Sequence, residues 1–200
     1  MIVTFTAQVS GEPGPGHVRP IPSDFVPVRI FLDSNALQAI QDYGEAIFER
    51  QDFILRGRSG ADREDVEALG GIFLFVERGA FELAVSANSL QEVAARADPG
   101  YLQWAFDVLD HWESCVRESE EPFAGSGRER VRLVDTNRFG YLSTKDAALI
   151  RDAVLLECDT FLTLDRKLAR NADHMSRELG LEVLRPPELY EVLRPHLCGL

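Results

Sequence analysis

Ser143 to Lys167 reads STKDAALIRDAVLLECDTFLTLDRK, an amphipathic helical pattern that leads into a short apolar run with an acid at each end. Asp146 lies at the start of the helical pattern, and Asp165 follows the apolar run 19 residues later. That separation accommodates about three helical turns, a tight corner at Cys158-Asp159 and a strand of about five residues. The spacing therefore predicts a helix and a strand that return both carboxylates to one edge of a parallel sheet, where ligands bind in such folds.

Two further apolar runs end at a polar junction before a helical pattern. Val28 to Leu32 (VRIFL) is followed by Asp33-Ser34-Asn35 and by a helical pattern from Ala36 to Glu49. Phe81 to Val85 (FELAV) leads into a helix whose first turn is expected to contain Glu92. The alternation predicts an α/β fold, a three-layer α/β/α sandwich with a central, mainly parallel sheet. Four carboxylates at one edge repel each other unless a cation lies between them.

Each of these acids has a second interpretation as a helix cap. Ser143–Asp146 and Ser89–Glu92 both have the spacing of a capping box, and Asp33 and Asp165 could each cap the helix that follows. Ser, Thr or Asn would satisfy a helix start equally well, so four acids at one sheet edge favour a divalent cation. Asp152 lies about 240° around the helix from Asp146 and is expected to face solvent, away from the site.

In their order and spacing, these residues resemble the PIN-domain nucleases. RIFLDSNAL resembles the first motif of that family, VSANSLQEV the second, and KDAALIRDAVLLECDTFLTLDRKL the third and fourth. LEVLRPPEL, from Leu181 to Leu189, resembles the closing strand and helix of the family. The resemblance covers about Val28 to Leu193. It implies a PIN-like domain over residues 28–200, preceded by a Pro- and Gly-rich extension over residues 1–27.

The chemistry expected of the acids is phosphodiester hydrolysis with Mg²⁺ or Mn²⁺. Hard cations take oxygen ligands, and a bound cation can activate water, orient a phosphodiester and stabilise the leaving oxygen. The expected catalytic and metal-binding residues are Asp33, Glu92, Asp146 and Asp165, supported by Asn35 and Thr163. The expected phosphate contacts are Lys145, Arg166, Lys167 and Arg170. The family resemblance adds that the substrate is RNA, cleaved internally.

The net charge of -12 is the main objection to a nucleic-acid substrate, because nucleic-acid-binding proteins usually present a basic face. The acidic site itself, once neutralised by a metal, accounts for part of this charge. A second interpretation keeps the PIN-like fold as a non-catalytic protein-binding module, in which the acids only cap helices. A third, an aspartyl phosphotransfer enzyme with Asp33 as nucleophile, lacks the second acid expected two residues later.

A chain of 200 residues with 45% hydrophobic content suits one α/β domain. The apolar runs are far shorter than the roughly 20 residues needed to span a bilayer, and the first residues lack the basic and apolar regions of a signal peptide. We therefore expect a cytoplasmic protein. The PIN resemblance implies a homodimer and, for the toxins of the family, a small antitoxin partner. The chain is bulkier than those compact toxins, which leaves a toxin role open.

Several segments outside the motifs carry separate expectations. The helix start at Asp62–Glu67 holds four acids and is expected to be an exposed face. Gly70-Gly71 is expected to interrupt that helix, which leaves Ile72 to Glu77 open as helix or strand. Pro99 to Glu118 is expected to supply core or dimer contacts. Ser119 to Gly127 is expected to be a charged loop, either beside the substrate or simply connecting.

Overall fold

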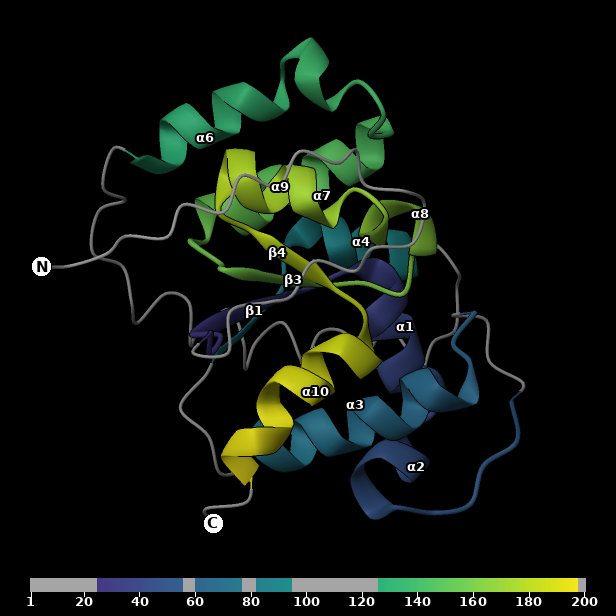
Figure 1. Cartoon of the computed structure of the whole chain (residues 1–200). Helices are drawn as coiled ribbons and strands as arrows, with labels where there is room; N and C mark the ends of the chain where they lie inside the picture. Colours follow the sequence, from purple (N-terminus) through teal and green to yellow (C-terminus); the bar gives the residue numbers. More distant parts are fainter. Residues whose placement is uncertain (1–24, 56–59, 77–81, 95–125, 198–200) are drawn as a thin grey trace, which may run out of the picture.

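The centre of the fold is a four-stranded sheet with the strand order β2-β1-β3-β4, in which all pairs are parallel. A computed structural model describes residues 25–55, 60–76, 82–94 and 126–197 of the chain (Figure 1). The strands are β1 (Arg29–Leu32), β2 (Glu82–Ala84), β3 (Thr160–Leu162) and β4 (Glu182–Leu184). The strands predicted from the sequence, including the closing one, are therefore confirmed.

Helices cover both faces of this sheet (Figure 1). One layer contains α1 (Ser34–Asp42), α2 (Gly44–Glu49), α3 (Arg63–Val76) and α10 (Pro186–Leu197). The other contains α6 (Ser126–Val134), α7 (Thr144–Leu155) and α9 (Ala172–Leu179). Helix α4 (Ala87–Ala94) contacts both α1 and α7, and the shorter elements are η1 (Asn137–Phe139) and α8 (Arg166–Ala169). The expected three-layer sandwich is confirmed, and none of the helices in the described ranges has the length and hydrophobicity that a membrane crossing requires.

Successive residues of the strands supply the two cores on opposite faces of the sheet. In β1, Ile30 and Leu32 pack on the α1–α3–α10 side, whereas Phe31 packs on the α7–α9 side. The ring of Phe31 stacks on that of Phe161 in β3, with centroids 5.2 Å apart. Because a one-residue slip would exchange the two faces, this alternation fixes the pairing of Leu32 with Leu162. The residues that follow the two strands are consequently held side by side.

Arg29 marks the amino edge of the sheet. Its guanidinium binds the Glu82 carboxylate at 2.6 Å and donates to the Leu156 carbonyl at 2.7 Å, so α7 ends at this edge. The N–H of Asp159 donates to the Arg29 carbonyl at 3.2 Å as the chain turns into β3. Because α7 has 12 residues and is therefore about 18 Å long, its first turn lies towards the opposite, carboxyl edge.

Two expectations about helix continuity are corrected. The helical pattern from Ala36 to Glu49 forms two helices, because Tyr43 leaves helical geometry at φ -126° and α2 begins at Gly44. Conversely, α3 continues through Gly70-Gly71, and residues 72–76 are helical. An added Cβ at Gly71 would lie 2.6 Å from Cδ2 of Tyr190, so a glycine there lets α10 pack closely against α3.

Three expectations concern parts of the chain outside the described residues. These are the extension up to residue 24, the segment 99–118 and the first part of the 119–127 segment. The last two residues of that segment, Ser126 and Gly127, begin helix α6.

Candidate functional site

The carboxyl ends of β1 and β3 form the switch point of the sheet. From β1 the chain continues to β2 on one side and then crosses to β3 on the other. In open parallel sheets, ligands bind in the crevice outside the strand ends at such a point. Asp33 directly follows β1, and Thr163 and Asp165 follow β3. The fold thus brings together predicted site residues that are up to about 130 positions apart in the sequence.

Asp33 is buried, with 6% of its surface exposed. The Thr163 hydroxyl donates to its Oδ2 at 2.6 Å, and the Asp33 N–H donates to the Leu162 carbonyl at 3.1 Å. Asp33 stands at the N-cap position of α1, yet its side chain makes no capping hydrogen bond. The capping interpretation is therefore wrong for Asp33. Asp33 is thus a buried carboxylate at the carboxyl edge of the sheet whose side chain bonds a hydroxyl and not the start of α1.

Thr163 connects the two strand-end acids. Its fully buried hydroxyl donates to Asp33 and accepts the backbone N–H of Asp165 at 3.0 Å. A hydroxyl has one proton, and the amide contact leaves that proton for Asp33. Thr163 thereby fixes the position of the Asp33 carboxylate relative to the chain at Asp165, which fits its predicted supporting role.

Asp165 and Asp146 are helix caps, as their second interpretation predicted. Oδ1 of Asp165 accepts the Lys167 N–H at 2.7 Å. Asp146 forms a capping box with Ser143, in which its Oδ2 accepts the Ser143 N–H at 3.2 Å and the Ser143 hydroxyl accepts the Asp146 N–H at 3.1 Å. Each cap uses one oxygen of a half-exposed carboxylate. Because a carboxylate has two acceptor oxygens, capping leaves each of these acids able to bind a cation.

Glu92 is not at the start of its helix. Helix α4 begins at Ala87, two residues before Ser89. The side chains of Ser86 and Ser89 each accept the backbone N–H of the other, at 3.3 and 3.0 Å. This pair closes the helix start, so the capping box expected at Ser89–Glu92 does not form and Glu92 belongs to the second turn. The side chain of Glu92 lies outside the described residues.

The predicted ligands at this edge suit a hard cation, because the donors among them are carboxylate, hydroxyl and amide oxygens. Asn35, the predicted companion of Asp33, is half-buried in the first turn of α1. Among the described residues, no group of three or more His, Cys, Asp or Glu side chains is arranged to hold a metal ion. The four-acid ligand set therefore stays a prediction, with Glu92 as the acid whose side chain is not described.

The predicted phosphate contacts differ in their surroundings. Lys145 is exposed in the first turn of α7, and Lys167 and Arg170 are exposed at α8. Arg166 instead binds the Asp62 carboxylate at 2.9 Å. Lys145, Lys167 and Arg170 therefore stay predicted phosphate contacts, whereas the guanidinium of Arg166 already has a carboxylate partner.

Asp152 is held by a partner and is not simply solvated. Its Oδ2 accepts the side-chain N–H of Asn88 at 2.8 Å, which ties α7 to α4. The expectation that Asp152 faces solvent is therefore wrong in part, because the residue is half-exposed and hydrogen-bonded.

A charged network beside the site was not predicted. Asp62 and Asp65 cap the start of α3 reciprocally, with N–H to carboxylate distances of 3.1 and 2.9 Å. Arg185, which follows β4, binds Asp65 at 2.7 Å and anchors this helix start at the carboxyl edge. Asp65 is 1% exposed, so the expected exposed acidic face is wrong at this residue. Two features of the sequence could have predicted this network: the D-x-x-D spacing of a reciprocal cap and an Arg directly after a strand.

The two acids of this cap have pKa values shifted in opposite directions. The hydrogen bond from the Asp65 N–H, helped by Arg185 and Arg166, lowers the pKa of Asp62. Burial raises the pKa of Asp65, although the Asp62 N–H and Arg185 oppose this effect. Asp65 is thus the acid whose charge depends most on Arg185, because solvent cannot replace that cation at a buried site.

An aromatic cluster joins the approach to α7 with α9. The Tyr141 hydroxyl lies 3.0 Å from Nδ1 of His174, and the His174 ring packs against that of Phe139 with centroids 4.8 Å apart. Burial raises the pKa of Tyr141. The cluster thereby links the segment that precedes α7 to α9.

Comparison of the chain with protein-family models, with curated proteins and with solved structures finds no match.

Proposed function

We propose that this protein is a divalent-metal-dependent endoribonuclease of the PIN type, which hydrolyses RNA phosphodiester bonds at the carboxyl edge of the sheet. The observation that carries the proposal is the buried Asp33 carboxylate at the switch point. It is oriented by Thr163 instead of capping α1, and the same hydroxyl fixes the chain at Asp165. A carboxylate whose orientation is fixed by a neighbouring hydroxyl is typical of a metal ligand, because ligating carboxylates are themselves hydrogen-bonded.

The proposed ligands of the cation are Asp33, Asp146, Asp165 and Glu92. A bound Mg²⁺ or Mn²⁺ would supply an activated water and charge stabilisation for the leaving oxygen. The protein would contribute fixed carboxylates: Thr163 orients Asp33, and the helix caps restrict Asp165 and Asp146. Lys167 and Arg170, exposed next to Asp165, would bind the phosphates on either side of the cut.

The test is cleavage of a fluorescent single-stranded RNA by the purified protein with Mn²⁺, against the same reaction with EDTA. Asp33→Asn is expected to reduce the rate by more than the roughly 10- to 100-fold that loss of a residue behind a metal ligand costs. Asp52→Asn is the matched control, since Asp52 is an exposed aspartate in the loop after α2. Cleavage that survives EDTA, or that is equal in Asp33→Asn and Asp52→Asn, would refute the proposal.

The second candidate function is a non-catalytic protein-binding module. It is favoured by the caps at Asp146 and Asp165 and by the net charge of -12. Calorimetric titration with Mn²⁺ separates the two functions. A nuclease is expected to bind Mn²⁺ in a way that Asp33→Asn weakens, whereas a binding module is expected to show no binding that depends on this carboxylate.

The proposal extends to location and partners in line with the PIN resemblance. We propose a cytoplasmic homodimer and, if the protein is a toxin, a small protein antitoxin. Light scattering of the purified protein tests the dimer. Expression that arrests growth in the parent but not in Asp33→Asn would support the toxin role, and unchanged growth with both would oppose it.

A further inference from the structure

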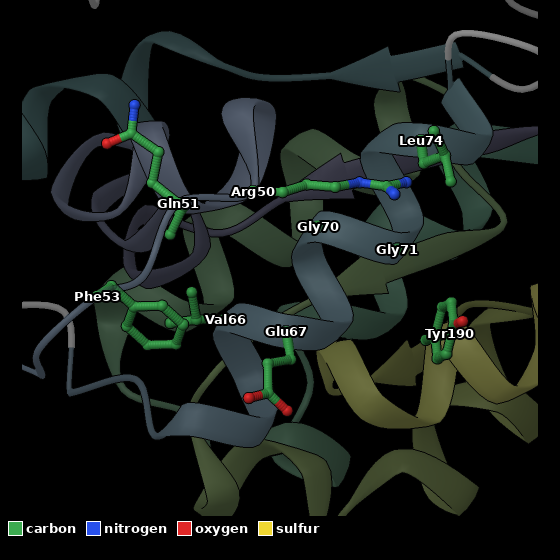
Figure 2. A pocket seen from close by; sticks show the side chains of 10 residues that line it. Arg50, Gln51, Phe53, Val66, Glu67, Gly70, Gly71, Leu74 and Tyr190 are labelled. Atoms are coloured by element: carbon green, nitrogen blue, oxygen red, sulfur yellow. The ribbon is translucent and has the colours of Figure 1, made fainter.

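A pocket of about 330 Å³ lies on the helical layer formed by α2, α3 and α10 (Figure 2). Its walls include Arg50, Phe53, Val66, Gly70, Leu74 and Tyr190. None of the proposed metal ligands or phosphate contacts lines it. Its volume is at the lower end of the roughly 300–1,000 Å³ found for ligand pockets, so an occupant would be a small molecule. Two features of the walls bear on what the pocket could hold.

The first feature is the backbone of Arg50, which ends α2 in the left-handed conformation at φ 56° and ψ 33°. Glycine is the usual residue at such a helix end, because a side chain there strains the backbone. The Arg50 side chain extends along the pocket past Gly70 and Gly71 towards Leu74 (Figure 2). The Arg50 N–H donates to the Glu45 carbonyl in this helix end. The end of α2 therefore places the Arg50 side chain along the pocket.

Arg50 is exposed, so its charge is accessible to a ligand in the pocket. Within the described ranges no carboxylate forms an ion pair with Arg50, although carboxylates bind Arg29, Arg166 and Arg185. An arginine is favoured where a carboxylate is to be bound, because its planar fork of donors matches the two carboxylate oxygens. Glu67, on the rim, is exposed and lies 3.6 Å from Arg63. Its negative charge would select a ligand with one negative charge over a ligand with two.

The second feature is Gly70, which lies in the middle of a 14-residue helix beside Gly71. Tyr190 explains Gly71, because an added Cβ would collide with its ring. At Gly70 an added Cβ would meet the Ile47 carbonyl oxygen at 3.5 Å and the Ile47 Cα at 3.8 Å, which are ordinary contacts. Packing therefore permits alanine at residue 70. Gly70 and Gly71 both line the pocket, so the α3 segment that contains them forms part of its wall.

We propose that this pocket binds a small organic monocarboxylate with an aromatic or branched aliphatic body. The carboxylate pairs with the Arg50 guanidinium. The apolar body packs on the Gly70 backbone, between Phe53 at one end of the pocket and Tyr190 at the other (Figure 2). In a protein with a net charge of -12, long-range electrostatics repel an anion. The apolar contacts and the single cation must therefore supply the affinity together.

The test is an NMR titration of the full chain with phenylacetate, with phenylacetamide as the neutral ligand of the same shape. Phenylacetate is expected to shift the amide signals of Arg50, Phe53 and Gly70 and to bind about tenfold more tightly than phenylacetamide, since charged hydrogen bonds are the stronger ones. Arg50→Gly is expected to abolish this preference and to keep the fold, because glycine adopts the left-handed conformation without strain.

Arg177→Ala is the matched control, because Arg177 is an exposed arginine on α9, in the other helical layer. It is expected to bind phenylacetate as the parent does. The thermal unfolding midpoint of each variant verifies that it is folded at the titration temperature. Equal binding of phenylacetate and phenylacetamide, an unchanged preference in Arg50→Gly, or no shift of the pocket amides at millimolar phenylacetate would each overturn the proposal.

Discussion

The neighbouring substitutions Gly70→Ala and Gly71→Ala are expected to have opposite effects on stability. Both gain about 1 kcal/mol of helix propensity, because each replaces a glycine inside α3. At Gly71 the new Cβ would lie 2.6 Å from Cδ2 of Tyr190, well inside the roughly 3.5–4.0 Å at which carbon atoms pack. Overpacking of this kind costs about 1–3 kcal/mol. At Gly70 the nearest atom would be 3.5 Å away, so no such cost arises.

Urea unfolding of the two variants measures the difference directly. Because the propensity gain is common to both, it cancels, and Gly71→Ala is expected to be about 1–3 kcal/mol less stable than Gly70→Ala. Gly70→Ala itself should be about 1 kcal/mol more stable than the parent. In a Tyr190→Ala background the difference should vanish, since the ring that causes the collision is gone. Equal stability of the two variants in the presence of Tyr190 would refute the packing argument.

Three further substitutions or treatments test other parts of the structure. Thr163→Val removes the hydroxyl that bonds Asp33 and the Asp165 N–H and is expected to reduce Mn²⁺ affinity and RNA cleavage about 10- to 100-fold. It should also cost about 1–3 kcal/mol of stability in urea unfolding; an unchanged Mn²⁺ affinity of the folded variant would argue against the orienting role of Thr163. Arg185→Gln leaves the buried Asp65 carboxylate without its cation, which should cost about 3 kcal/mol at pH 7. Burial already raises the pKa of Asp65, and loss of Arg185 raises that pKa further. The folded variant therefore takes up a proton more readily than the unfolded chain, so the loss should shrink as the pH falls through that pKa; an equal loss in urea unfolding at pH 4 and pH 7 would contradict this reasoning. Cys158 is buried, and burial raises the pKa of its thiol. Peptide mapping after alkylation should find Cys158 modified only in the unfolded protein, and rapid modification of the folded protein would contradict the assigned burial.

The strands and their parallel direction were predictable because they depend on local patterns. Apolar runs of four or five residues, each followed by a polar junction and a helical pattern, suffice for a parallel sheet. Once the sheet is parallel, all strand ends meet at one edge. Asp33 and Thr163 are therefore expected at the same edge, although they are 130 positions apart. Their hydrogen bond also requires β1 and β3 to be neighbours, which the local patterns do not determine.

The details that escaped prediction depend on neighbours that are distant in the sequence. In the sequence, Asp65 is one of several acids at a helix start. In the structure it is buried, and Arg185, 120 residues later, pairs with it. Gly70-Gly71 reads as a helix interruption, since two glycines cost about 2 kcal/mol of helix propensity. In the structure α3 continues through both glycines, and Gly71 allows the ring of Tyr190 in α10 to pack closely against α3. Propensity is a local quantity, and tertiary packing overrides it here.

The distance between the two halves of the proposed active site also has a consequence during protein synthesis. A ribosome adding about 5–20 residues per second needs roughly ten seconds to make the 130 residues that separate Asp33 from Thr163. Throughout that interval the emerging polypeptide contains the first acid but not its partner strand. A nuclease built in this way would be harmless to its own messenger while translation continues, and any inhibitor would need to act only on completed molecules.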